Sequence, residues 1–161
     1  LRLAGLPPVP PPMPPKSSIA GGWSGGESQA HKDLKRYVFE HPELCGAGAD
    51  WFAQEEYALR SGDELDVMFM SDRLWIGIEV KSHTSDQFPR DYERGIYQVV
   101  KYKAVLDAQA RIDHASAPPE VRVLLVLETR LPDSYLELAR TLGVGCIEEL
   151  SSVANSADRQ A

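Results

Sequence analysis

The sequence predicts an α/β domain in which a mixed central β-sheet is flanked by helices on both sides. Segments with helical and with strand periodicity follow one another in the order helix, three strands, helix, strand, helix, strand. Residues 65–81 contain two strands joined by a short reversal, which makes that pair antiparallel. Residues 121–127 are apolar on both faces, as expected for a strand buried inside a sheet. The series therefore indicates a mixed sheet.

The first half of the domain contains one helix and three strands. The helix is predicted over residues 25–41, where four residues recur at helical spacing on one stripe: Glu27, His31, Leu34 and Val38. Pro42 ends this helix. Strands are expected over residues 52–59, 65–70 and 74–81, separated by turn signals.

The second half contains two helices and two strands. A helix is predicted over residues 91–110 and is followed by a polar loop with two prolines. The buried strand over residues 121–127 comes next, then a helix over residues 132–142. A short strand over residues 144–147 completes the domain.

Composition and charge fit one domain of a particular kind. The 161 residues, 43% of them hydrophobic, allow one buried core and are too few for two full-sized domains. Two distant cysteines, Cys45 and Cys146, fit neither a disulfide framework nor a four-ligand zinc site, so we expect a reducing, cytoplasmic setting. No apolar run approaches the roughly 20 residues that span a bilayer. The net charge of -7 disfavours a protein that coats nucleic acid but leaves a nuclease possible.

The domain is expected over residues 24–150. Residues 1–23 predict a proline- and glycine-rich leader or linker, because seven of the 12 prolines lie between Pro7 and Pro15. Docking of this segment to a proline-recognising partner is the alternative. Residues 151–161 are small and polar and predict a flexible tail.

The hairpin of residues 65–81 contains three charged residues that the predicted register brings together. A symmetric reversal about Asp72 and Arg73 gives paired positions whose numbers sum to 145, and this places Asp66 across from Glu79. Alternation then puts three charged residues on one face, Asp66, Glu79 and Lys81, and an apolar set on the other: Leu65, Val67, Phe69, Ile76, Ile78 and Val80. Opposed carboxylates about 5 Å apart repel unless a cation lies between them.

The cation expected there is Mg²⁺ or Mn²⁺, which prefer oxygen ligands and accept phosphate oxygens as further ligands. Lys81 would position or activate the attacking water and stabilise charge on the transition state. An ordinary surface cluster of ion pairs is the alternative. The helix expected to cover this face, and the neighbours Met68, Trp75 and Gly77, favour a cleft instead.

These residues resemble the motifs of the PD-(D/E)xK, or restriction-endonuclease-like, superfamily, whose core order of helix, three strands, helix and strand matches residues 24–148. The motifs are Gly62-Asp63-x-x-Asp66 and Ile78-Glu79-Val80-Lys81. The resemblance implies that Asp66 and Glu79 bind the metal, that the carbonyl of Val80 is another ligand, and that Lys81 is the catalytic lysine. Leu65 stands where the family motif often has proline.

Two further pairs of residues are candidates. Gln98 and Tyr102 have the Q-x-x-x-Y spacing of the RecB-like branch, in which this pair supports the active site; a plain amphipathic helix is the alternative. By the same resemblance His31 is a further metal ligand. The alternative is a half-buried histidine without that role. Glu27 either completes the metal site or belongs to a capping box that starts at Ser24.

The sequence thus predicts a metal-dependent endonuclease that hydrolyses DNA phosphodiester bonds, in repair, restriction or defence. A catalytically idle nucleic-acid-binding or scaffolding module of the same fold and a toxin-type nuclease are the alternatives. RNA as substrate stays open, because the catalytic residues act on phosphate. A homodimer, or association with other domains or proteins, is also left open.

Overall fold

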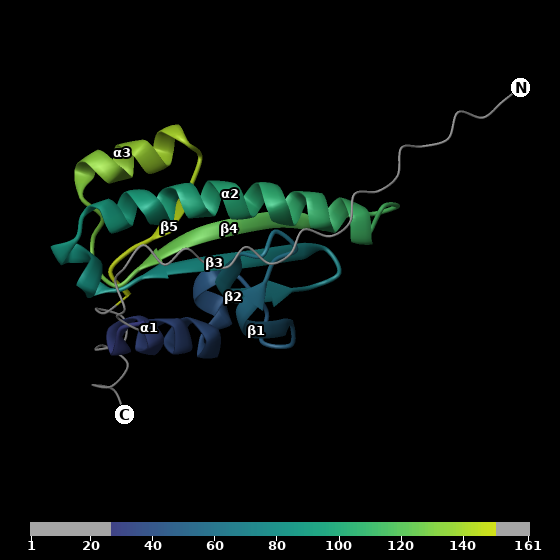
Figure 1. The fold of residues 1–161 in the computed structure, drawn as a ribbon. Coiled ribbons are helices and arrows are strands. Elements are labelled where there is room, and N and C mark those ends of the chain that lie inside the picture. Colours follow the sequence, from purple (N-terminus) through teal and green to yellow (C-terminus); the bar gives the residue numbers. More distant parts are fainter. Residues whose placement is uncertain (1–26, 151–161) are drawn as a thin grey trace, which may run out of the picture.

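A computed structural model describes residues 27–150, so the predicted leader and tail lie outside the described residues. The chain forms a five-stranded sheet in the order β1-β2-β3-β4-β5, with one helix on one face and two on the other (Figure 1). The strands are β1 (Phe52–Ala58), β2 (Glu64–Met70), β3 (Leu74–Lys81), β4 (Glu120–Leu127) and β5 (Gly145–Ile147). The first three are antiparallel and the last three parallel, which confirms the predicted mixed sheet.

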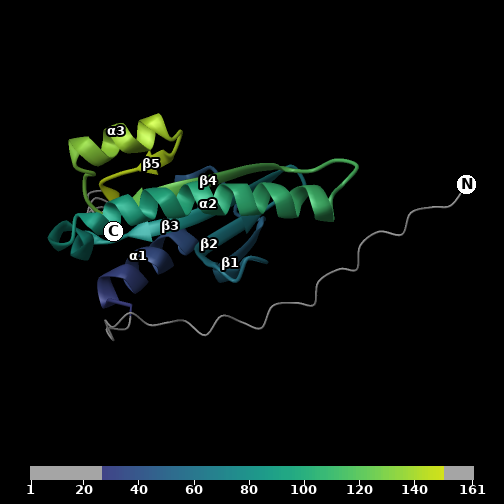
Figure 2. The same ribbon diagram turned by 45° about the horizontal axis from the view of Figure 1, so that its top comes forward.

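The helices cover both faces, as predicted. They are α1 (Gln29–Glu40), α2 (Arg90–Asp113) and α3 (Asp133–Thr141). Two short 3-10 helices, which the sequence did not predict, lie after α1 and before α2: η1 (Pro42–Cys45) and η2 (His83–Gln87). Figure 2 shows α2 and α3 together on one side of the sheet and α1 on the other. Of the helices in the described residues, none combines the length and apolar composition needed to cross a membrane.

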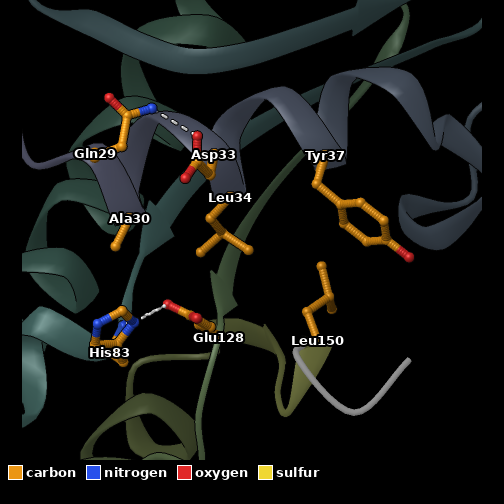
Figure 3. Close-up of a pocket in the computed structure, with 8 residues that line it drawn as sticks. All are labelled: Gln29, Ala30, Asp33, Leu34, Tyr37, His83, Glu128 and Leu150. Atoms are coloured by element: carbon orange, nitrogen blue, oxygen red, sulfur yellow. Dashed lines mark hydrogen bonds and ion pairs between the residues drawn. The ribbon is translucent and has the colours of Figure 1, made fainter. Parts of the chain in front are cut away.

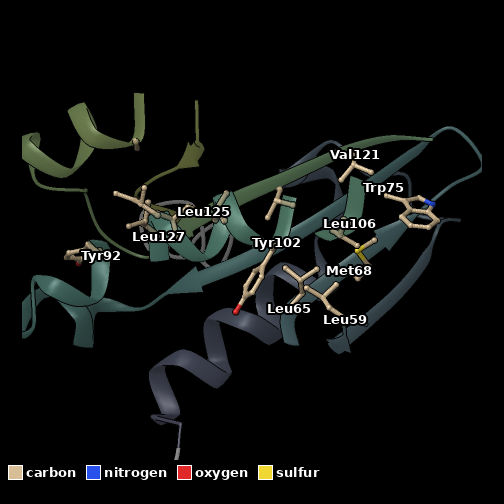
Figure 4. Close-up of a cluster of buried hydrophobic side chains, with 14 of the residues drawn as sticks. Leu59, Leu65, Met68, Trp75, Tyr92, Tyr102, Leu106, Val121, Leu125 and Leu127 are labelled. Atoms are coloured by element: carbon tan, nitrogen blue, oxygen red, sulfur yellow. The ribbon is translucent and has the colours of Figure 1, made fainter. Parts of the chain in front are cut away.

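The sheet separates two apolar cores. The larger one lies between the sheet and the helices α2 and α3 (Figure 4), and its fully buried members include Leu65, Met68, Ile96, Leu106, Leu125 and Leu127. The smaller one packs α1 against the opposite face through Leu34, Val38, Val67, Phe69, Ile76 and Ile78. Because β3 and β4 contribute to both cores, they have the two-sided apolar composition of buried parallel strands.

Helix α1 begins at Gln29, four residues later than predicted. Ser28 is its N-cap, and the Oγ of Ser28 accepts a hydrogen bond of 3.2 Å from the backbone N–H of His31. Glu27 therefore precedes the helix and is not its third residue. The capping-box interpretation of Glu27 was wrong, because the chain uses a serine four residues further on.

The register of the β2–β3 hairpin is confirmed. Paired residue numbers sum to 145 from Val67 and Ile78 to Met70 and Trp75. The regular ladder ends one step before Asp66 and Glu79.

Leu65 lies on the opposite face from the one predicted. Alternation grouped it with Val67, but it belongs to the core beneath α2, where a β-carbon at Gly77 would lie 2.9 Å from its Cδ1. Strand β2 is therefore distorted between Leu65 and Val67. Glu56, which faces Asp66 in the β1–β2 register, has a φ of 52°, uncommon for a residue with a side chain. This distortion accounts for the broken alternation.

Candidate active site

Three side chains converge at one end of the hairpin: Glu27 just before α1, His31 on α1 and Asp66 on β2. The Nε2 of His31 lies 2.9 Å from Glu27 Oε1 and 3.1 Å from Asp66 Oδ1. One ligand atom from each of the three residues lies within 4.8 Å of the others. Neighbouring ligands of an octahedral ion with bonds of about 2.1 Å are separated by about 3 Å, so these distances fit a small divalent cation.

Lys35, on the second turn of α1, holds Glu27 in this position. Its ammonium donates to Glu27 Oε1 at 2.8 Å and to Glu56 Oε1 at 2.9 Å, although the residue is only 5% exposed. Burial lowers the pKa of Lys35, but the hydrogen bonds that it donates to the two carboxylates, together with their charges, outweigh this effect and the pKa is raised. Lys35 therefore stays charged and fixes one oxygen of Glu27 beside His31.

Asp66 links this group to β3. Its Oδ2 accepts a hydrogen bond of 2.7 Å from the backbone N–H of Val80, while its Oδ1 faces His31. The backbone N–H of Val80 thus bonds to a side-chain carboxylate, just beyond the last regular β2–β3 pair, Val67 and Ile78. Because the N–H and C=O of one strand residue point to the same side, the carbonyl of Val80 also lies on the Asp66 side of β3.

Glu79 and Lys81 form a buried ion pair beneath α2. Lys81 Nζ donates to Glu79 Oε1 at 3.0 Å, and the residues are 7% and 5% exposed. Burial, and then the negative charge of Asp66, raise the pKa of Glu79 to about 7, against the opposing effect of Lys81. The Lys81 ammonium also lies 3.6 Å from Asp91 Oδ1 on the first turn of α2.

Helix α2 leaves room for the lysine at Gly95. A β-carbon there would lie 2.8 Å from Lys81 Cε, closer than carbon atoms approach, so the lysine stem packs directly on the helix backbone. The structure places α2 over the charged face as the sequence predicted. The pair Glu79 and Lys81 is consequently shielded from water on this side.

Gln98 and Tyr102 lie one turn apart on α2. Gln98 Nε2 donates to the hydroxyl of Tyr102 at 3.0 Å. Burial raises the pKa of Tyr102, and the nearby charges of Glu79 and Asp66 add to this. The Oε1 of Gln98 is buried and has no hydrogen-bond partner within the described residues. An unpaired buried acceptor costs about 1–3 kcal/mol, so this oxygen is a candidate partner for a bound water or ligand.

Two hollows flank α1. The one in Figure 3, of about 390 Å³, contains none of the predicted site residues; in it His83 Nδ1 lies 2.7 Å from Glu128 Oε2. The other, of about 420 Å³, is lined by Ser28, Thr84, Ser85, Phe88 and Asp91. Two of its lining residues neighbour the charged cluster: Ser28 follows Glu27 in the chain, and Asp91 Oδ1 lies 3.6 Å from Lys81 Nζ.

The structure brings the predicted residues together in two adjacent groups. Glu27, His31 and Asp66 form one, and Glu79 with Lys81 forms the other. Asp66 lies beside His31, and Glu79 lies beside Lys81. Sequence reasoning missed the contributions of three residues: Lys35, Asp91 and Gly95. The contacts of Lys35 are visible only in the structure, where its ammonium is buried between Glu27 and Glu56.

Comparison of the sequence with protein-family models and with curated proteins gives no match. Among solved structures, the chain is similar to a repair endonuclease from Pyrococcus abyssi, with 17% identity, a TM-score of 0.49, and coverage of 78% of this chain and 49% of that one. It is also similar to an EndoMS-dsDNA2 complex, with 18% identity, a TM-score of 0.48, and coverage of 79% and 49%. The chain spans about half the length of these proteins. Because both TM-scores are below 0.5, we base the functional proposal on this chain's own side chains.

Proposed function

We propose that this chain is a metal-dependent nuclease that hydrolyses phosphodiester bonds in DNA. The observation that carries the proposal is the cluster of Glu27, His31 and Asp66 at ion-binding distances, directly beside a buried lysine and glutamate. An ordinary surface ion-pair cluster would be solvated. Here Glu79 and Lys81 are among the few charged residues buried in the described part of the chain.

Mg²⁺ or Mn²⁺ fits the donor set. Asp66 and Glu27 supply carboxylate oxygens, and the carbonyl of Val80 faces the same side of β3. His31 adds a nitrogen donor, which suits Mn²⁺ better than Mg²⁺. When bound, the ion supplies polarisation of a phosphate oxygen and a lowered pKa of a coordinated water.

Lys81 has the role of stabilising the reacting phosphate. Its ammonium is held by Glu79 and faces Asp91, so it keeps a fixed position without water around it. A charge fixed in a dry site acts on a phosphate more strongly than one in solvent. Gln98 Oε1 offers an acceptor that can orient the attacking water, and Tyr102 holds the amide in place.

A cleavage assay tests the proposal. Purified protein is incubated with a labelled DNA panel of single-stranded, duplex and branched molecules, with an RNA strand in parallel, in Mn²⁺, Mg²⁺ or EDTA. We expect metal-dependent cleavage, none in EDTA, and a loss of at least 100-fold in Asp66→Asn and Lys81→Ala, which remove a ligand and the charge that stabilises the transition state. Robust cleavage by either variant, or cleavage in EDTA, contradicts the assignment. Cleavage of RNA alone would change the substrate and leave the site assignment intact.

A further inference from the structure

One face of α2 carries a stripe of basic and aromatic residues beside the candidate site. The residues of this α2 stripe are spaced four, three and four apart, and all are exposed: Arg90, Arg94, Tyr97 and Lys101. One residue further round the helix lies the set that faces the charged cluster: Asp91, Gly95, Gln98 and Tyr102. The α2 stripe therefore runs alongside the site for roughly 16 Å, at 1.5 Å per residue.

The two arginines of the α2 stripe are available to a ligand. Within residues 27–150, no carboxylate forms an ion pair with Arg90 or Arg94, whereas Lys101 pairs with Asp63 at 2.7 Å. Many other basic side chains are engaged, such as Arg36 with Glu40 and Glu55. In a chain of net charge -7, two unpaired guanidiniums one helical turn apart are a localised anion-binding feature.

Exposed aromatic rings flank these arginines. Tyr97 is 51% exposed and lies one turn after Arg94, and Phe88 is 56% exposed just before the helix. Phe88 also lines the hollow that leads to Asp91 and Ser28. Exposed aromatic faces next to guanidiniums are the combination that binds unpaired bases and their phosphates.

We infer that the α2 stripe, together with Phe88, binds a single strand of nucleic acid and leads it to the charged cluster. This inference rests on the proposed function. Arg90 and Arg94 contact successive phosphates, since positions one turn apart on a helix are about 6 Å apart and match the repeat of an extended strand. Bases stack on Phe88 and Tyr97. Duplex DNA has no free base faces for these rings, so the stripe selects unpaired strands or strand ends.

Binding is measured by fluorescence anisotropy with labelled 20-mers of thymidine and of uridine and with a 20-base-pair duplex, all in EDTA so that no cleavage occurs. Wild-type protein should bind the single strands more tightly than the duplex. Phe88→Ala and Tyr97→Ala should each weaken single-strand binding at least fivefold, because a stacked base is lost. Arg90→Ala with Arg94→Ala should reduce the slope of log affinity against log salt by about 1.4, the value for two phosphates of a single strand.

Matched controls lie at the other end of the same helix. Arg111→Ala, at an exposed position in the last turn of α2, and Ile112→Ala, at a position that is 69% exposed, should bind as the wild type does. Equal losses in these controls, binding unchanged by the stripe variants, or tighter binding of the duplex would overturn the inference. The two proposals can fail separately. Single-strand binding in EDTA without any metal-dependent cleavage would contradict the proposed nuclease activity. Metal-dependent cleavage that is unchanged in the α2 stripe variants would contradict only the proposed binding of a single strand along α2.

Discussion

The buried Glu79 predicts an unusual pH dependence of stability in the metal-free protein. Its pKa is raised from 4.5 to about 7 in the folded state, chiefly by burial and then by Asp66. Because the folded protein holds this proton more tightly than the unfolded chain, Glu79 stabilises the fold below pH 4.5. The contribution is lost as the pH rises through 7.

The magnitude follows from the two pKa values. With 4.5 in the unfolded chain and about 7 in the folded one, Glu79 contributes roughly 2–3 kcal/mol at pH 5 and close to zero at pH 8. Glu79→Gln cannot titrate. The wild type should therefore lose roughly 2–3 kcal/mol more unfolding free energy between pH 5 and pH 8 than this variant does.

Urea unfolding followed by tryptophan fluorescence, in EDTA at pH 5, 6, 7 and 8, measures the difference. Trp75 is buried in the larger core and reports on the fold. Glu120→Gln alters an exposed glutamate at the start of β4 and should follow the wild-type pH curve. If the curves of the wild type and Glu79→Gln run parallel, Glu79 is not held in the buried environment described here.

Two further predictions concern residues that support the cluster. Gly95→Ala should lower the cleavage rate at least tenfold, because the added methyl group displaces Lys81. The circular dichroism of the protein should be retained, since alanine favours the helix by about 1 kcal/mol relative to glycine. An unchanged cleavage rate would show that the lysine need not pack on α2. Lys35→Met should weaken Mn²⁺ binding about tenfold in titration calorimetry, since Glu27 loses the ammonium that holds it; unaltered affinity would leave Lys35 with a purely structural role.

Periodicity predicted most of the fold because it reports on which face of each element is buried. The β2–β3 register and the bounds of β3, Leu74–Lys81, follow from period-two alternation about a symmetric turn. The face of Leu65 was missed because alternation assumes a regular strand. The distortion at Glu56 and Asp66 arises from contacts between elements, and nothing in the local sequence encodes it.

The location of the candidate site residues was predictable where these residues lie within one segment of the sequence. Asp66, Glu79 and Lys81 belong to a single hairpin, so their shared location followed from spacing. The role of Lys35 depends on Glu56, 21 residues away on another strand, and lysines on amphipathic helices are ordinarily solvated. The start of α1 was misplaced because both Ser24 and Ser28 are acceptable caps, and the choice between them depends on tertiary contacts.

The contact between His31 and Asp66 joins segments that lie 35 residues apart, one on a helix and the other on the central sheet. A metal ion bound by both His31 and Asp66 would link α1 reversibly to β2 beside the smaller core. Because the site exists only in the folded geometry, the ion binds the folded protein in preference to the unfolded chain, and its occupancy strengthens the docking of α1 onto the sheet. Helix α1 would then be more protected from hydrogen exchange when the ion is present and would open more readily when the ion is withdrawn.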